Sequence, residues 1–266
     1  MAIFKSHRGM SWSYDSVGQG HPVLLIHGFA GSSQWWINQV EFLKQDFQVI
    51  TIDLPGHGQS SWMPITPREI AVDIAQIFAH LHIHEVNVMA SSMGGLVAFE
   101  LYRQVPLAVM RMSLVGSLPK LSQAPGYLAG LDVEKIRTLS NQFDGNYAGI
   151  LDIFFRSLFT IKERDSEAFK AVKELRSNDT LPQREALKYF LDIIEKYDLR
   201  DRVSTVICPL QFIRGKEDYI CTQEASDWVS EHTYNARFDV MEGCGHLPFL
   251  TEVKEYNRLL EDFLLS

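Results

Sequence analysis

The chain of 266 residues contains little cysteine, no long apolar run and fewer basic than acidic side chains. Its three cysteines (Cys208, Cys221 and Cys244) form no CxxC pair, so we expect reduced thiols in a cytoplasmic protein. No stretch of 18 apolar residues occurs and the start lacks an apolar signal segment, so we expect neither a membrane span nor a secretory signal. The formal charge of −8 argues against nucleic acid or a polybasic membrane surface as the main partner.

The rest of the composition is that of an ordinary globular protein. Hydrophobic residues make up 46% of the chain and charged residues 22%, which excludes disordered and low-complexity architectures. A chain of this length can bury well over half of the surface that it exposes when unfolded. It therefore needs no disulfide or metal to hold a core together.

Short apolar runs alternate along the chain with amphipathic segments of helix length, which predicts an α/β sheet covered on both faces. We expect strands at residues 23–26, 47–52, 86–89, 112–115, 210–213 and 237–241. We expect helices at residues 33–43, 66–81, 93–104, 222–230 and 253–265. The second of these helices opens with Thr66-Pro67-Arg68-Glu69, a capping box with proline at the first helical position.

The rhythm of the sequence changes after Pro119. Residues 120–197 have helical periodicity and no convincing strand. We therefore expect one α/β domain, built from residues 1–118 and 200–266, that is interrupted by a helical cap at residues 119–199. The chain shows no internal repeat.

Ser92 is the candidate nucleophile. It lies between a predicted strand and a predicted helix in Ala90-Ser91-Ser92-Met93-Gly94. A sharp turn from strand to helix exposes its middle residue only where small residues stand two positions before and after it. Ala90 and Gly94 meet this requirement for Ser92, whereas Met89 and Met93 do not meet it for Ser91. A serine that merely caps the helix would give the same short pattern.

A serine hydroxyl needs a base to take its proton, and the base needs a third group to orient it. Asp218 and His246 each follow a predicted strand, at the edge of the sheet where open α/β folds place their sites. Taken alone, Asp218 could be a turn residue and His246 a solvated loop histidine. The chain order Ser92, Asp218, His246 is that of a hydrolase triad. We expect the backbone N–H groups of Met93 and Phe29 to bind the developing oxyanion.

Other groups of reactive side chains are weaker candidates. His80, His82 and His84 alternate, but they cross a predicted helix end, where histidine suits the helix dipole, and no cluster of cysteines or carboxylates supports them. Cys244 lies near His246 but has no strand-to-helix turn of its own. No phosphate-binding loop or zinc motif is present. We therefore expect no metal and no cofactor.

With these residues in view, the sequence resembles the α/β-hydrolase superfamily over nearly its whole length. The matching motifs are His27-Gly28-Phe29, residues 53–60 (DLPGHGQS), Ser92-Met93-Gly94-Gly95 and Gly245-His246. Ala90 departs from the glycine that is usual in the family, but alanine is also small. Serine rather than aspartate at position 92 argues against the haloalkane dehalogenases and epoxide hydrolases. The resemblance implies an α/β-hydrolase fold, with a mostly parallel sheet flanked by helices.

Within the superfamily, the chain looks most like the pimeloyl-acyl carrier protein methyl ester carboxylesterases of biotin synthesis. The similarity rests on the size of the cap and on residues 197–200 (YDLR), which end 18 positions before Asp218. It implies a carrier-presented acyl ester as substrate and an acyl channel lined by Phe154, Phe155 and Leu158. It also implies a basic docking face for the acidic carrier protein, made of Lys170, Lys173 and Arg176. An ordinary solvated helix face explains these three charges equally well.

Three functions stay open at this point. The first is a serine carboxylesterase. The second is a hydrolase of carbon–carbon bonds in ring-cleavage products, or a relative that forms peracids, because Ser-Met-Gly-Gly occurs in these too. The third is a ligand receptor that keeps the pocket without useful turnover. Fold alone does not decide between them.

Overall fold

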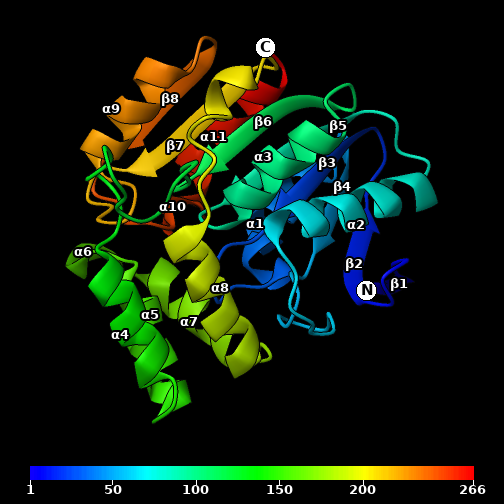
Figure 1. Ribbon diagram of the computed structural model, residues 1–266. Helices are drawn as coiled ribbons and strands as arrows, with labels where there is room; N and C mark the ends of the chain where they lie inside the picture. The colour runs from blue at the N-terminus through cyan, green and yellow to red at the C-terminus, as the bar shows by residue number, and fades with distance from the viewer.

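Eight strands form one sheet in the computed structural model, which describes residues 1–266 (Figure 1). They are β1 (Ala2–Lys5), β2 (Ser11–Val17), β3 (His21–Ile26), β4 (Phe47–Ile52), β5 (Val86–Ser91), β6 (Val109–Val115), β7 (Leu210–Gly215) and β8 (Ala236–Met241). The spatial order is β1-β2-β4-β3-β5-β6-β7-β8. The pairs β1–β2 and β2–β4 are antiparallel and all others are parallel. The predicted α/β-hydrolase architecture is therefore confirmed.

Helices cover both faces of this sheet, and a further group of them packs beyond one of its edges. They are η1 (Ser33–Trp36), α1 (Ile37–Leu43), α2 (Pro67–His80), α3 (Gly94–Gln104), α4 (Val133–Gln142), α5 (Tyr147–Ser157), α6 (Ile161–Arg164), α7 (Glu167–Ser177), α8 (Arg184–Lys196), η2 (Val203–Thr205), α9 (Gln223–His232), α10 (Pro248–Thr251) and α11 (Val253–Leu264). None of them is both long enough and apolar enough to cross a bilayer.

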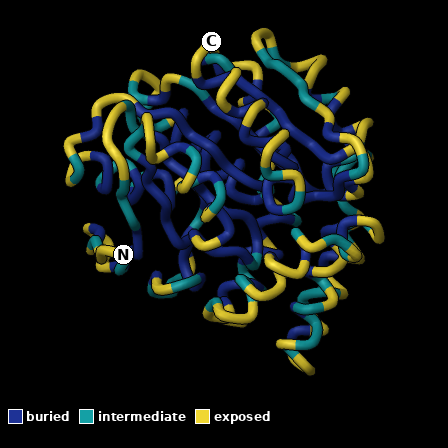
Figure 2. The backbone as a smooth tube through the Cα atoms, turned by 180° about the vertical axis from the view of Figure 1, so that it is seen from behind, coloured by how far each residue is buried: buried dark blue, intermediate teal, exposed yellow.

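The sheet separates two hydrophobic cores. Leu24 and Ile26 of β3 face the core shared with α2, α3 and α9, whereas Val23 and Leu25 face the core shared with α1 and α11. This alternation is the two-residue period of a strand that is buried on both sides. Figure 2 shows the result, with buried strands running through the middle of the molecule and exposed segments around them.

Helices α4 to α8 lie between β6 and β7 and pack beyond one edge of the sheet (Figure 1). We call residues 119–199 the cap; these boundaries stay a prediction. Two side chains near its start bond to the end of its last helix. The ammonium group of Lys120 donates to the carbonyl oxygen of Glu195 at 2.7 Å, and the hydroxyl of Ser122 donates to the same oxygen. Both ends of the cap are thereby joined at its base.

Two features of the fold differ from the expected elements. The strands β1 and β2 were not predicted, because the sequence of β2 (SWSYDSV) is polar and β1 is an exposed edge strand. The helix expected at residues 33–43 consists of a 3₁₀ turn, η1, followed by α1. Its first turn tightens where Ser32 accepts a hydrogen bond from the backbone N–H of Gln34.

Candidate active site

Ser92 sits at the turn between β5 and α3, with a backbone φ of 52° that few residues other than glycine adopt. Its N–H donates to the carbonyl oxygen of Val115 at 2.9 Å, which holds the turn against β6. The crowding expected around Ser92 is present, since a Cβ atom at Gly94 would lie only 2.6 Å from the carbonyl oxygen of His27. Strain of this kind persists only where the surrounding structure enforces it, and it often marks a functional site.

His246 links Ser92 to Asp218. Its Nε2 lies 2.9 Å from the Ser92 hydroxyl oxygen, and its Nδ1 lies 2.7 Å from a carboxylate oxygen of Asp218. Asp218 follows β7 and His246 follows β8, so both loops leave the same edge of the sheet as Ser92. Because a carboxylate only accepts, the Nδ1–H donates to it and leaves Nε2 free to accept the serine proton.

The carboxylate of Asp218 is held in its ionised form. Burial alone would raise its pKa, but the adjacent His246 ring and the backbone N–H groups of Ile220 and Cys221 lower this pKa below its usual value. One carboxylate oxygen accepts both backbone bonds, at 2.8 and 3.1 Å, and the other accepts from His246. Asp218 is therefore fixed in place and charged.

Two backbone N–H groups beside Ser92 have no acceptor within the chain. They belong to Met93, which follows the serine, and to Phe29, in the loop after β3. The ring of His27 stiffens this loop, because its Nδ1–H donates to the carbonyl oxygen of Gly28 and its Nε2 accepts from the N–H of Leu54. Free N–H groups at this position can stabilise negative charge on a substrate oxygen.

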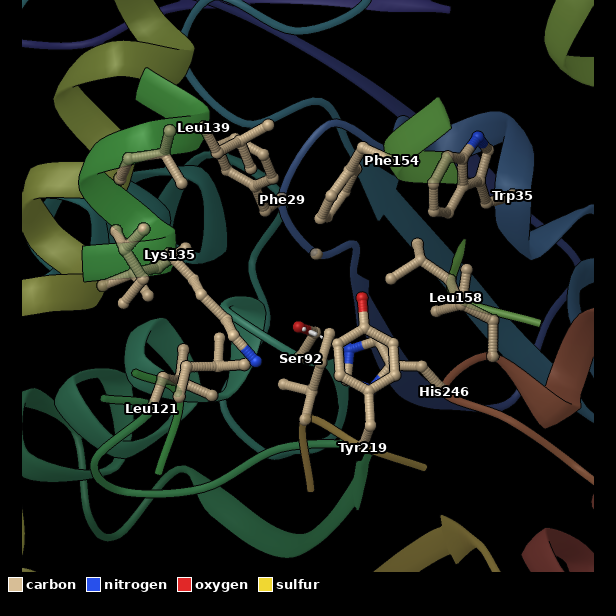
Figure 3. Close-up of a pocket in the computed structure, with 17 residues that line it drawn as sticks. Phe29, Trp35, Ser92, Leu121, Lys135, Leu139, Phe154, Leu158, Tyr219 and His246 are labelled. Carbon is tan, nitrogen blue, oxygen red and sulfur yellow. Dashed lines mark hydrogen bonds between the residues drawn. The ribbon is translucent and has the colours of Figure 1, made fainter. Parts of the chain in front are cut away.

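A cavity of about 190 Å³ opens above Ser92 and His246 (Figure 3). Thirteen of its 17 lining residues are hydrophobic. Phe29 and Trp35 form the core side, and Phe154 and Leu158 contribute from α5 and its C-terminal end. An apolar cavity that ends at a serine and a histidine suits an acyl chain whose polar group reaches the serine.

Comparison with known proteins agrees with this geometry. A family model described as the alpha/beta hydrolase fold matches residues 21–253. The chain belongs to the α/β-hydrolase family. A pimeloyl-[acyl-carrier protein] methyl ester esterase from Nitrosomonas europaea is 27% identical to this α/β hydrolase, over 91% of the chain and 95% of the relative.

Solved structures of other α/β hydrolases share the fold. An esterase from Exiguobacterium antarcticum superposes with a TM-score of 0.91 and 21% identity, covering 100% of this chain and 99% of the other. The enol-lactonase from Burkholderia xenovorans LB400 superposes with a TM-score of 0.88 and 19% identity, covering 100% of both chains.

The prediction that Phe155 of this α/β hydrolase lines the cavity is wrong. Phe155 does not line the cavity but packs on the other side of α5, among Trp35, Phe159 and Phe169. Its neighbour Phe154 faces the cavity and contacts Phe29 edge to face. Adjacent residues on a helix point about 100° apart, so an apolar run in the sequence does not show which of its members face the ligand.

The predicted basic face needs a second correction. Arg176 is half-buried in the cap, where it pairs with Asp152 at 3.0 Å and stacks over the Phe155 ring. It is a structural contact and not part of an exposed docking face. Lys170 is exposed but pairs with Glu167 on the same helix, and Lys173 is exposed without an ion pair.

Other reactive side chains lie outside the reaction geometry. Burial raises the pKa of Cys244 to about 12, so its thiol stays protonated and unreactive. His57 is buried against Phe190 and His27 rather than facing the cavity. The histidines at positions 80–84 form no metal-binding group with other side chains.

Two polar residues of the cavity were not identified from the sequence. Tyr219 directly follows Asp218, and its hydroxyl lies 3.1 Å from that of Ser157 in the cap. Lys135 enters the cavity from α4. The sequence signal for Lys135 is its place next to Ile136 and one helical turn before Leu139, two apolar residues of this short helix.

Proposed function

We propose that this α/β hydrolase is a serine carboxylesterase that works through an acyl-enzyme. The observation that supports this most is the hydrogen-bonded series Ser92–His246–Asp218, which ends in an apolar cavity. His246 Nε2 takes the proton of the Ser92 hydroxyl as its oxygen bonds to the ester carbonyl carbon. The carbonyl oxygen becomes an oxyanion, which the N–H groups of Phe29 and Met93 bind.

The intermediate then collapses. The bond from the carbonyl carbon to the alcohol oxygen breaks, and protonated His246 gives its proton to the departing alcohol. A water molecule next attacks the acyl-enzyme, with His246 again as base, and the acid and free Ser92 are released. Asp218 keeps the His246 ring oriented and stabilises its cation in both halves of the reaction.

For the substrate, we propose the methyl ester of an acyl chain carried by acyl carrier protein, as the name of the Nitrosomonas europaea relative indicates for that protein. Matching coverage of 91% and 95% of the two chains, cap included, supports this substrate. The acyl chain would lie in the apolar cavity while the carrier stays outside. A carrier-linked substrate, together with three free cysteines, favours a cytoplasmic location.

The carrier would meet the exposed lysines of α7, Lys170 and Lys173. Exposed charge pairs contribute up to about 1 kcal/mol each and act mainly on encounter rate. We expect reversal of both lysines to glutamate to lower kcat/KM for a carrier-linked methyl ester about tenfold, and more at low salt. Hydrolysis of p-nitrophenyl butyrate should not change, since it carries no protein. Equal effects on both substrates would contradict carrier docking on α7.

Substrate panels separate this function from its alternatives. An esterase gives a burst of p-nitrophenol from a short acyl ester, whereas a receptor on the same fold gives none. A hydrolase of carbon–carbon bonds cleaves vinylogous diketones, which the proposed esterase leaves intact. Cleavage of such diketones in preference to esters would replace the proposal.

A further inference from the structure

Lys135 brings a cation to the apolar cavity from α4. Lys135 and Leu139 are four residues apart in this helix, Leu131 stands just before the helix, and all three line the cavity. Side chains four apart lie on one face of a helix. Lys135 is thus on the face that α4 presents to the cavity, together with Ile136 and Leu139, and it is the one lysine or arginine among the lining residues.

The acidic side chains near Lys135 are engaged elsewhere. Glu134 pairs with Arg137 at 2.8 Å, and Arg137 also binds Glu195. Asp132 accepts the backbone N–H of Glu134 as the N-cap of α4. No ion pair in the molecule includes Lys135, and Figure 3 shows its nitrogen directed into the cavity, toward the side where Ser92 lies.

Lys135 is exposed, so its ammonium group is hydrated in the free protein and can exchange that water for an acceptor on a ligand in the cavity. Its three N–H donors bind carboxylate oxygens best, and neutral carbonyl oxygens less strongly. The reacting ester already has its own partners in Ser92 and in the N–H groups of Phe29 and Met93. The acceptor for Lys135 therefore belongs to a different part of the substrate, which is the acyl chain.

We propose that Lys135 is a specificity-determining residue that binds an oxidised far end of the acyl chain, so that the preferred substrates are monoesters of dicarboxylic acids. The inference rests on the esterase function proposed above and names the substrate class more closely. A free carboxylate is the stronger ligand of Lys135. In a carrier-linked chain, the thioester carbonyl oxygen takes the same place as a neutral acceptor.

The test uses three methyl esters of equal chain length that end in a carboxylate, a carboxamide or a methyl group. We expect kcat/KM of the wild-type enzyme to fall in that order. Loss of a hydrogen bond to a charged group corresponds to roughly a 10- to 100-fold change, so Lys135→Met should lower kcat/KM for the carboxylate ester by this factor. The methyl-terminated ester should change less than about threefold, and Lys135→Glu should make the carboxylate ester the poorest substrate.

Lys188→Met is the matched control, because Lys188 lies on the cap but pairs with Asp144 at 2.8 Å outside the cavity. It should leave the order of the three substrates unchanged. An equal loss on all three esters in Lys135→Met, or no preference in the wild type, would overturn the role of Lys135 while leaving the esterase function standing. If the wild-type enzyme hydrolyses none of the esters, the esterase function fails, and the inference fails with it.

Discussion

The backbone N–H of His246 donates a hydrogen bond of 2.7 Å to the carbonyl oxygen of Leu158, so the cap is bonded directly to the loop that carries this histidine. The approach is close enough that a Cβ atom on Gly245 would lie 2.5 Å from the same oxygen. Leu158 also lines the cavity. The segment of the cap that lines the cavity therefore also holds the proposed catalytic base.

Glu163 of α6 strengthens this connection. Its buried carboxylate accepts the N–H of Gly245 at 2.8 Å and the hydroxyl of Thr251 at 2.6 Å. It also accepts the N–H of Thr160, which closes the first turn of α6. One carboxylate thus joins the cap to the residues on both sides of His246.

We expect Glu163→Ala to lower kcat about tenfold with little change in KM, because alanine offers no acceptor to the N–H groups of Gly245 and Thr160 or to the Thr251 hydroxyl. Unsatisfied buried donors also cost about 1–3 kcal/mol of folding stability each. Steady-state kinetics at a temperature where the variant is folded separates the two effects. Glu167→Ala, at an exposed position on the next helix, is the control. A loss of stability with unchanged kcat would show that Glu163 only supports the fold.

Ser92→Ala should abolish ester hydrolysis, with a loss of about 10⁴- to 10⁶-fold in kcat, as for other nucleophile deletions. The neighbouring Ser91→Ala provides a matched control, because the hydroxyl of Ser91 is buried without a hydrogen-bond partner. It should retain activity. An active Ser92→Ala enzyme beside an inactive Ser91→Ala enzyme would show that the nucleophile is assigned to the wrong serine.

Asp218→Asn should lower kcat by several orders of magnitude, because an amide no longer favours the His246 orientation that leaves Nε2 free for the serine. Glu217 is adjacent in sequence but exposed, so Glu217→Gln should have little effect. Both variants can be assayed with p-nitrophenyl butyrate. Comparable losses in the two would argue that the loop, rather than the Asp218 carboxylate, matters.

The parts of this protein that could be predicted from the sequence depend on local signals. The strands from β3 to β8 are apolar runs between helices, and Ser92, Asp218 and His246 follow three of them in the order typical of the family. The side chains that shape the cavity depend on which face each cap helix turns inward. The different surroundings of Phe154 and Phe155, and the ion pair of Arg176 with Asp152, arise from contacts between helices. Contacts between helices that are distant along the chain leave no local pattern in the amino-acid sequence.

His57 gives a prediction about acid stability. Burial first, and then the charge of the neighbouring His27, lowers the pKa of His57 to about 3. Its Nδ1–H donates to the carbonyl oxygen of Pro55, while Nε2 is buried without a partner. The unfolded chain binds a proton at this residue near pH 6.5, whereas the folded protein does so only near pH 3. The folding stability that goes with an uncharged His57 is therefore present in full above about pH 6.5. It is lost as the pH falls from there toward 3, because the unfolded chain takes up a proton that the folded protein does not.

Between pH 7.5 and pH 5, this difference should cost the wild-type protein about 2 kcal/mol, at 1.36 kcal/mol per pH unit below 6.5. His57→Asn keeps a donor for the Pro55 carbonyl oxygen but cannot take up a proton. We expect it to be less stable at neutral pH, because it loses contact with Phe190, and to lose less stability on acidification. Urea unfolding at both pH values measures the two effects. The carboxylates that both proteins share contribute equally to the pH dependence of stability. Equal slopes for His57→Asn and the wild type would therefore contradict the role of His57.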